Sequence, residues 1–186
     1  MNNINLVLPE IFISLSIMFL LVLGVFKKNS SKLVYNIALL ILLFSIIIIL
    51  NETYSIDRIT LFNDSIVIDY MSSLMKIITL ISAFFVLVIS PSYLKTFKIF
   101  KIEYPILILS SVLGMMVMIS SNDLMVFYMG LELQSLALYV LATFNRDQLK
   151  SSEAGLKYFV LSALSSGLLL YGCSLIYGFS GSTNFD

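Results

Sequence analysis

The sequence of 186 residues contains no histidine, no tryptophan and a single cysteine, Cys173. One cysteine cannot form a disulfide within the chain, and without histidine the chain alone has neither a Cys/His zinc site nor a His-ligated haem. The missing histidine also excludes a Ser-His-Asp triad and other His-based acid–base chemistry built from this chain alone.

Charge is scarce and balanced. Lys and Arg total 11, Asp and Glu total 11, and the formal net charge is +0, so no basic field indicates a nucleic-acid partner. Hydrophobic residues make up 59% of the chain, and the mean hydropathy is +1.01. A soluble domain of this length needs more polar surface, so the composition predicts an integral membrane protein.

The first residues do not resemble a targeting segment. Residues 1–5 carry no Lys or Arg, and no Arg/Ser-rich presequence precedes the first apolar run. Residue usage favours Ile, Leu, Phe, Asn, Lys and Tyr, whose codons are mostly AT-rich. An organelle-encoded protein of the mitochondrial inner membrane explains both features, and so does a plasma-membrane protein of a bacterium with an AT-rich genome.

Six apolar runs have the length of a membrane span, roughly 20 residues. We therefore predict an all-α integral membrane protein with six transmembrane helices in one membrane domain, residues 1–186. The approximate bounds are 6–26, 33–50, 70–93, 105–120, 123–144 and 152–179. Alternation at residues 65–68 indicates a small β-hairpin in an external loop. The short link at residues 121–123 makes the fourth and fifth spans antiparallel neighbours.

Basic residues gather in the first, third and fifth connections. These residues are Lys27, Lys28, Lys32, Lys95, Lys98, Lys101, Arg146 and Lys150, with Lys157 just beyond. The intervening loops carry only Arg58. Because Lys and Arg favour the cytoplasmic or matrix side, the odd connections should face that side and both termini the opposite one.

Glu132 lies about nine residues into the fifth span, roughly 14 Å deep and close to mid-bilayer. A carboxylate there is costly unless it is paired, hydrated or protonated, and such acids usually mark functional sites. The alternative is a neutral, hydrogen-bonded glutamate that joins helices. Tyr128 and Ser135 share its face and are the candidate hydrogen-bond partners.

Two further charged groups lie in or beside the spans. Glu153 and Lys157 have the i, i+4 spacing of a helical ion pair, which serves either a functional role or the anchoring of the helix end. Lys76 lies two turns into the third span, and we expect its long stem to snorkel to the outer surface as an anchor. In the sixth span, Ser162/Ser166 and Ala163/Gly167 are small-residue pairs that permit close helix packing.

Two motifs in order carry a family resemblance. Residues 130–142 read Gly-Leu-Glu-Leu-Gln-Ser-Leu-Ala-Leu-Tyr-Val-Leu-Ala and are followed by Phe144-Asn145-Arg146, and residues 151–159 read Ser-Ser-Glu-Ala-Gly-Leu-Lys-Tyr-Phe. This resembles the antiporter-like membrane subunit of NADH:ubiquinone oxidoreductase, respiratory complex I, called subunit 2 in mitochondria and subunit N in bacteria. The match is dense across about residues 122–183 and looser over the first three spans.

The resemblance implies a proton-translocating subunit of the membrane arm in the respiratory chain, a non-redox part of a translocase. NADH, FMN, iron–sulfur clusters and ubiquinone would be bound by other subunits, and this chain would hold no cofactor or metal. Glu132, Glu153 and Lys157 match family positions of the proton pathway. In the family, the acid matched by Glu132 pairs with a lysine on a later, broken helix.

Family members have more than twice as many spans as this chain, so it corresponds to the front part of such a subunit. We expect a split subunit, in which a second chain supplies the missing helices. Other membrane-arm subunits and lipids would be its partners. A cation/proton antiporter subunit of the Mrp type and a structural membrane scaffold are the alternatives.

Overall fold

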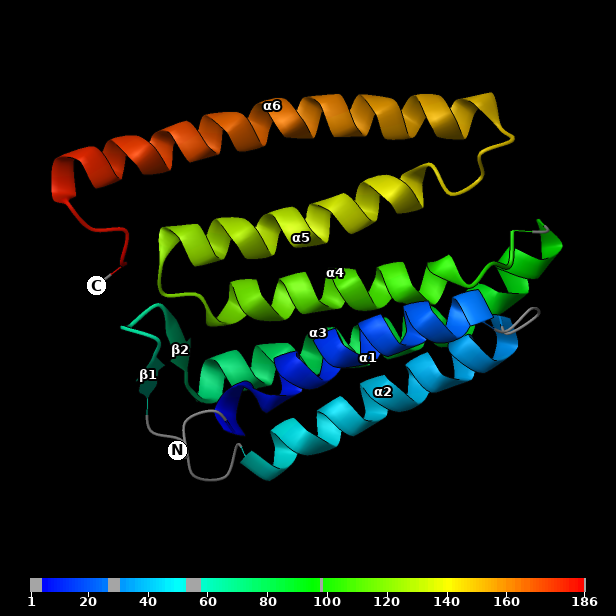
Figure 1. The fold of residues 1–186 in the computed structure, drawn as a ribbon, viewed down its shortest axis with the longest axis horizontal. Helices are drawn as coiled ribbons and strands as arrows, with labels where there is room; N and C mark the ends of the chain where they lie inside the picture. Colours follow the sequence, from blue (N-terminus) through cyan, green and yellow to red (C-terminus); the bar gives the residue numbers. More distant parts are fainter. Residues whose placement is uncertain (1–4, 27–30, 53–57, 98, 186) are drawn as a thin grey trace.

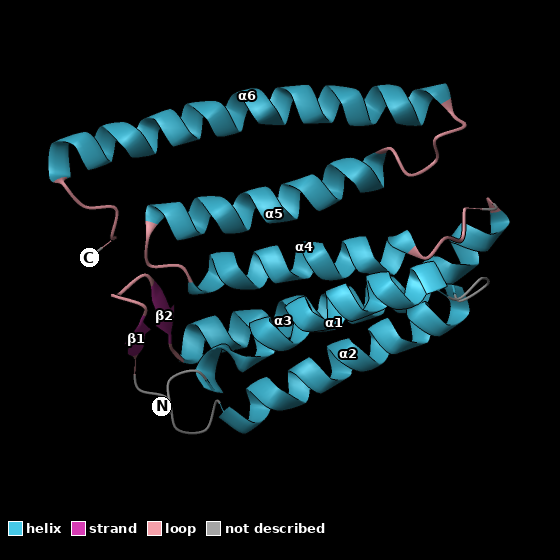
Figure 2. Ribbon diagram, viewed as in Figure 1, coloured by secondary structure: helices cyan, strands magenta, loops and turns pink. Residues whose placement is uncertain are grey.

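The computed structural model describes residues 5–26, 31–52, 58–97 and 99–185. Within them, six helices are long and apolar enough to cross a membrane, as predicted (Figures 1 and 2). After a short 3₁₀ turn, η1 (Asn5–Val7), the helices are α1 (Leu8–Phe26), α2 (Ser31–Glu52), α3 (Tyr70–Thr96), α4 (Glu103–Ser120), α5 (Leu124–Ala142) and α6 (Leu149–Ser180). The predicted ends differ from these by three residues or fewer. Where a helix is longer than predicted, as at the starts of α2 and α6, polar residues such as Ser31 and Lys150 continue the helical backbone beyond the apolar run.

The helices lie side by side, with α6 along one edge of the molecule and α2 along the other (Figure 1). The apolar core lies among the first four helices, where Ile13, Leu42, Leu87 and Leu109 are completely buried. Helix α5 packs on α4, and α6 packs on α5. Consequently α6 is the least covered helix, with large apolar side chains exposed along most of its length.

The predicted β-hairpin is present between α2 and α3. Strand β1 (Ile59–Leu61) pairs antiparallel with β2 (Ile66–Ile68), and Thr60 lies opposite Val67. The following residue, Asp69, caps α3: its carboxylate accepts from the Ser72 N–H at 2.7 Å, while its own N–H donates to Ser72 Oγ at 3.0 Å. This reciprocal capping box fixes the start of α3 directly beneath the hairpin.

The link between α4 and α5 is held from two sides, an arrangement that we call the clasp. On one side, Asn122 donates its N–H to Ser65 O at 2.9 Å and its Nδ2–H to Asp64 O at 3.0 Å in the hairpin turn. On the other, Leu124 N–H donates to Thr183 O at 2.9 Å in the segment after α6. The clasp therefore joins three segments distant in sequence at one end of the molecule.

Asp123 is the charged member of the clasp and the N-cap of α5. Burial acts to raise the pKa of its carboxyl, but hydrogen bonds from the Thr183 hydroxyl and from the N–H groups of Met125 and Val126 outweigh burial and hold that pKa below its ordinary value. The carboxylate is thus ionised at neutral pH and favourably placed at the positive end of the α5 dipole.

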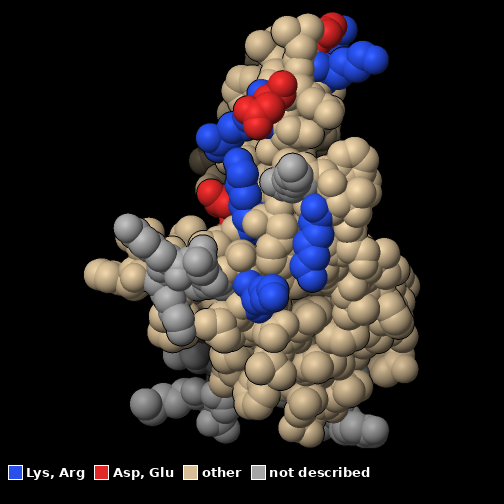
Figure 3. Space-filling model, turned by 90° about the vertical axis from the view of Figure 1, so that its right-hand side faces the viewer, with Lys and Arg blue, Asp and Glu red and all other residues tan. Residues whose placement is uncertain are grey.

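The ends of α1, α3 and α5 and the starts of α2, α4 and α6 lie at the end of the molecule opposite the clasp (Figure 1). Figure 3 looks onto this end and shows Lys and Arg side chains spread over it. The charge bias and the fold therefore agree that one end is basic, which is the arrangement expected of a cytoplasmic side.

Orientation in the membrane is a prediction that cysteine labelling tests. In a Cys173→Ser background, an impermeant thiol reagent applied from outside should modify Ser182→Cys, beside the clasp, and should not modify Ser31→Cys, at the basic end. Asn2, a further outer position by the same reasoning, lies outside the described residues. The reverse labelling pattern would contradict the orientation.

Candidate functional site

Two glycines bring α4 and α5 into backbone contact. A Cβ added at Gly114 would lie 2.6 Å from Gln134 N and 2.7 Å from Gly130 O, and one added at Gly130 would lie 2.9 Å from Met118 N. No side chain can be accommodated at such distances without moving a helix. This crossing holds α5 against α4 at Gly130, which precedes Glu132 by two residues.

Glu132 lies near the middle of α5, on the side that faces α6. It precedes Tyr139 by seven residues, so the two share one face of the helix two turns apart. Tyr139 is buried against α6, where its hydroxyl donates to Ser162 and its ring centroid lies 4.9 Å from that of Tyr158. The Glu132 carboxylate is therefore directed toward the boundary between α5 and α6.

One carboxylate oxygen of Glu132 has no partner. Its Oε1 is buried and accepts no hydrogen bond in the described residues, and no Lys or Arg of those residues forms an ion pair with Glu132. The expectation that Tyr128 or Ser135 would hydrogen-bond to this oxygen is wrong for the described chain. An ionised carboxylate in this position requires a cation or water supplied from elsewhere.

The α6 surface that meets α5 supplies no cation. Its buried or half-buried positions are Ser151, Gly155, Ser162, Ser166, Gly172 and Cys173. All of them except Gly172 follow one helical stripe, with spacings of four, seven, four and seven residues. Ser162 and Ser166 thus pack toward α5. This agrees with the prediction that small residues in the sixth span permit close helix packing. Gly167, in contrast, has no atom within 4 Å of an added Cβ, so that part of the small-residue face is uncovered.

Glu153 and Lys157 form the predicted ion pair, with Lys157 Nζ 2.5 Å from Glu153 Oε1. Both side chains are more than half exposed, at 53% and 68% respectively. The pair lies in the first turns of α6, at the basic end, and is separated from Glu132 along the helix axes. An exposed pair contributes little to stability, about 0–1 kcal/mol.

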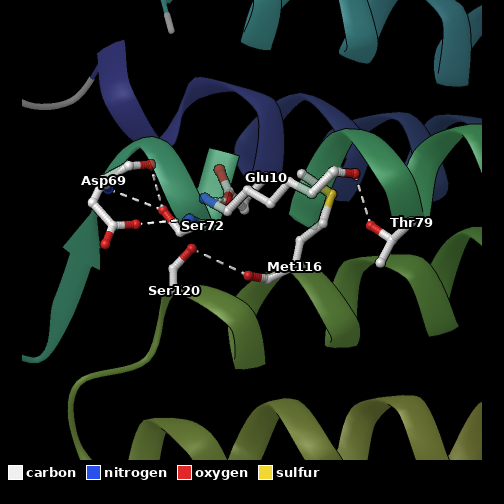
Figure 4. A network of polar contacts seen from close by, with 7 residues as sticks. Glu10, Asp69, Ser72, Thr79, Met116 and Ser120 are labelled. Carbon is white, nitrogen blue, oxygen red and sulfur yellow. Dashed lines mark hydrogen bonds and ion pairs between the residues drawn. The ribbon is translucent and has the colours of Figure 1, made fainter. Parts of the chain in front are cut away.

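Lys76 does not snorkel to the surface, contrary to the prediction. Its side chain is 3% exposed, and its Nζ lies 2.5 Å from Oε1 of Glu10 in α1. Figure 4 shows this part of the bundle, with Glu10 of α1, Ser72 of α3 and Met116 of α4 drawn as sticks. The apolar bundle encloses the whole lysine stem, and a carboxylate inside it replaces the water that snorkelling would have reached.

Sequence reasoning missed Glu10 as the partner of Lys76. Both residues lie within about two turns of helix ends that start on the clasp side, Glu10 in α1 and Lys76 in α3. The sequence could have indicated this pair, because the two residues have opposite charges and lie at similar depths in spans that enter from the same side. Removing either partner of such a buried pair costs about 3–5 kcal/mol because the other charge is left uncompensated.

In the described ranges, no three His, Cys, Asp or Glu side chains are grouped closely enough to hold a metal ion. The charged and polar groups described above are carboxylates, lysines and hydroxyl groups, which bind and release protons.

Comparison with known families and structures gives a consistent result. The family described as "NADH:quinone oxidoreductase/Mrp antiporter, TM" matches residues 121–186, the part that contains both motifs. A subunit of respiratory complex I from Thermus thermophilus superimposes with a TM-score of 0.80 at 26% identity, covering 95% of this chain and 38% of that one. A chain of an archaeal membrane-bound sulfane sulfur reductase shares the fold, with a TM-score of 0.79 at 23% identity.

Curated relatives extend the similarity to all six spans. NADH-quinone oxidoreductase subunit N of Pelagibacter ubique is 73% identical over 186 residues, which are 100% of this chain and 39% of the relative. The subunit N of Paramagnetospirillum magneticum is 48% identical over 180 residues, or 97% of this chain and 37% of the relative. The chain thus spans less than two fifths of the length of these bacterial relatives. Over its whole length, the chain is similar to the antiporter-like subunit N of NADH-quinone oxidoreductase, the family that residues 130–159 indicated.

Proposed function

We propose that the chain is part of a proton-translocating membrane-arm subunit of an NADH:quinone oxidoreductase in a bacterial plasma membrane. The observation that carries this proposal is the Glu132 carboxylate, which lies in the middle of a membrane span with a buried oxygen that no described group satisfies. Intramembrane acids of this kind mark proton and ion pathways. The similarity to subunit N of an NADH-quinone oxidoreductase supports the proposal that the ion is the proton and that quinone reduction supplies the energy.

The chain itself performs no redox step in this proposal. NADH, FMN, iron–sulfur clusters and ubiquinone are bound by other subunits, and the coupling reaches this chain through charged groups. Glu132 binds and releases the proton, and the Glu153–Lys157 pair lies nearer the basic surface, where protons enter from water. Each transfer moves a proton between a carboxylate, an amine and water, so no other reactant is consumed.

Glu132 needs a cationic partner, and the uncovered face of α6 indicates where it comes from. The large apolar side chains exposed there include Leu161, Leu164, Leu168 and Tyr171. We propose that further helices of the subunit cover this face and bring a lysine close to Glu132. An opposite charge within about 4–6 Å favours the ionised carboxylate.

Co-purification tests this assignment. A tagged form of the chain, solubilised from native membranes in mild detergent, should retain NADH:quinone reductase activity together with a polypeptide that carries the remaining helices. An untagged strain provides the control. Sodium- or potassium-dependent proton exchange without NADH oxidation would favour the Mrp-type alternative. A chain recovered with lipid alone would contradict the proposed covering of α6.

A further inference from the structure

We propose that Glu10 and Lys76 form a second proton-binding site, which exchanges protons with water at the clasp end of the molecule. The proposal combines a buried ion pair that has a spare carboxylate oxygen with a polar pocket that leads to it. It concerns different residues and different helices from Glu132, and it does not require the proposed function.

The ion pair leaves one oxygen unused. Glu10 is 7% exposed and Lys76 is 3% exposed, and Nζ contacts Oε1, whereas Oε2 of Glu10 is buried without a hydrogen-bond partner in the described chain. A carboxylate that served only to join α1 to α3 would be most stabilising with both oxygens bonded. The free Oε2 is the atom at which an additional proton can be bound.

A pocket of about 350 Å³ opens beside the hairpin and the start of α3. Its lining residues are Arg58, Val67, Asp69, Met71, Ser72, Met75, Ile119, Ser121 and Asn122. Four of the residue types that line it, Arg, Asp, Ser and Asn, offer polar groups, and the volume is sufficient for several water molecules. The pocket therefore brings water into contact with the first turns of α3.

Ser72 connects this pocket with the ion pair. It lines the pocket and precedes Lys76 by one turn, on the same face of α3. Figure 4 shows Ser72 joined to Asp69 and Ser120 joined to Met116 by hydrogen bonds. Both serines are buried, and each hydroxyl donates to a backbone carbonyl but keeps a lone pair that can accept from water entering from the pocket.

Several other charges lie at the same end of the bundle as the pair. The described ones are Asp69 and Arg58, which line the pocket, Asp64 in the hairpin turn and Asp123, whose carboxylate accepts from the Thr183 hydroxyl. Met116 and Ser120 of α4 do not titrate, and the described charges of α2 and α4, Lys32 and Glu103, lie at the opposite, basic end.

The proton exchange is balanced within the pair and the pocket water. In the resting state, the Lys76 ammonium and the Glu10 carboxylate have no net charge. Uptake of one proton from pocket water forms an O–H bond at Oε2 and leaves a carboxylic acid beside an ammonium, with a net charge of +1. Release of that proton to the pocket restores the ion pair.

Infrared spectroscopy of the assembled complex in sided vesicles tests proton binding. Lowering the pH on the outer side should produce a deuterium-sensitive carboxylic-acid band that is absent from the double variant Glu10→Gln/Lys76→Met, in which neither charge is left unpaired.

Glu10→Asp keeps the ion pair and should shift the band rather than remove it. Glu103→Gln, in the first turn of α4 at the basic end, should leave the outer-side response unchanged. An outer-side response identical in wild type, Glu10→Asp and the double variant would overturn the proposal, and so would a band that follows only the inner pH.

Cysteine accessibility tests the pocket independently and requires no change to the pair. In a Cys173→Ser background, Met75→Cys lies in the pocket, whereas Ile81→Cys lies deeper on α3 with nearly the same exposure, 40% against 39%. A charged thiol reagent applied from outside should modify Met75→Cys at least about tenfold faster, because thiolate formation needs water and is suppressed in apolar surroundings. Equal, slow modification of both variants would show that water does not reach the start of α3 and would overturn the proposal.

Discussion

Glu132→Gln is expected to leave the complex assembled and to lower proton translocation per NADH oxidised by at least about tenfold, which is less than the roughly 10²–10⁴-fold that a positioned proton-transfer group contributes to a rate. Glutamine keeps the shape of the side chain and can still hydrogen-bond, but it cannot take up or release a proton at neutral pH. Because the buried Oε1 has no described partner, the substitution breaks no hydrogen bond within this chain. Proton uptake by proteoliposomes and NADH oxidation rate, measured together, give the ratio.

Glu153→Gln is the matched control for that experiment. It removes the same chemical group from a pair that is more than half exposed, where water can replace the lost partner, so its effect should be milder. Normal proton-to-electron coupling in an assembled Glu132→Gln complex would refute the role of Glu132. Equal losses in the two variants would show that the depth of the carboxylate does not matter.

Gly114→Ala is expected to destabilise the packing of α4 on α5 by about 1–3 kcal/mol, the usual cost of overpacking. The added Cβ would meet two backbone atoms at 2.6 and 2.7 Å, and neither can rotate away as a side-chain tip could. The helices must separate, and Glu132 must move with α5. The yield of assembled complex and its thermal unfolding midpoint should both fall.

Gly178→Ala provides the comparison, because a Cβ at that position meets nothing within 4 Å in this chain. The same change of residue type in the same kind of helix should therefore leave yield and midpoint nearly unchanged. If both variants unfold at the wild-type temperature, the close crossing at Gly114 is not a determinant of stability.

The helices were predictable from the sequence because each span is a local run of apolar residues whose length is fixed by the membrane. The hairpin and the neighbouring position of α4 and α5 were predictable for a similar reason, since residues 65–68 and the short link at 121–123 constrain only nearby chain. The motif around Glu132 and the pair Glu153–Lys157 were also recognisable locally. Helix α6 meets α5 as a neighbour in sequence as well as in space.

The pairing of Glu10 with Lys76 could not be read in this way. The two residues are 66 positions apart, and their contact depends on how α1 and α3 are arranged around α4. Considered alone, a lysine near the end of a span can extend its ammonium group to water at little energetic cost. The sequence therefore predicted that Lys76 would snorkel to the surface. The crossing at Gly114 and Gly130 was missed for the same reason, because each glycine is unremarkable until the helix that faces it is known.

The length of α6 has a consequence for the lipid around it. With 32 residues the helix is about 48 Å long, whereas the hydrocarbon core of a bilayer is about 30 Å thick. Even a tilt of about 40°, the upper end of what spans adopt, leaves roughly 37 Å along the membrane normal. At least one end of α6 therefore projects into the headgroup layer, and its first turns carry Lys150, Glu153 and Lys157, which suit that layer. Bilayer thickness thus sets how far the Glu153–Lys157 pair stands from the hydrocarbon, so thicker lipids should draw it inward and thinner lipids should expose it.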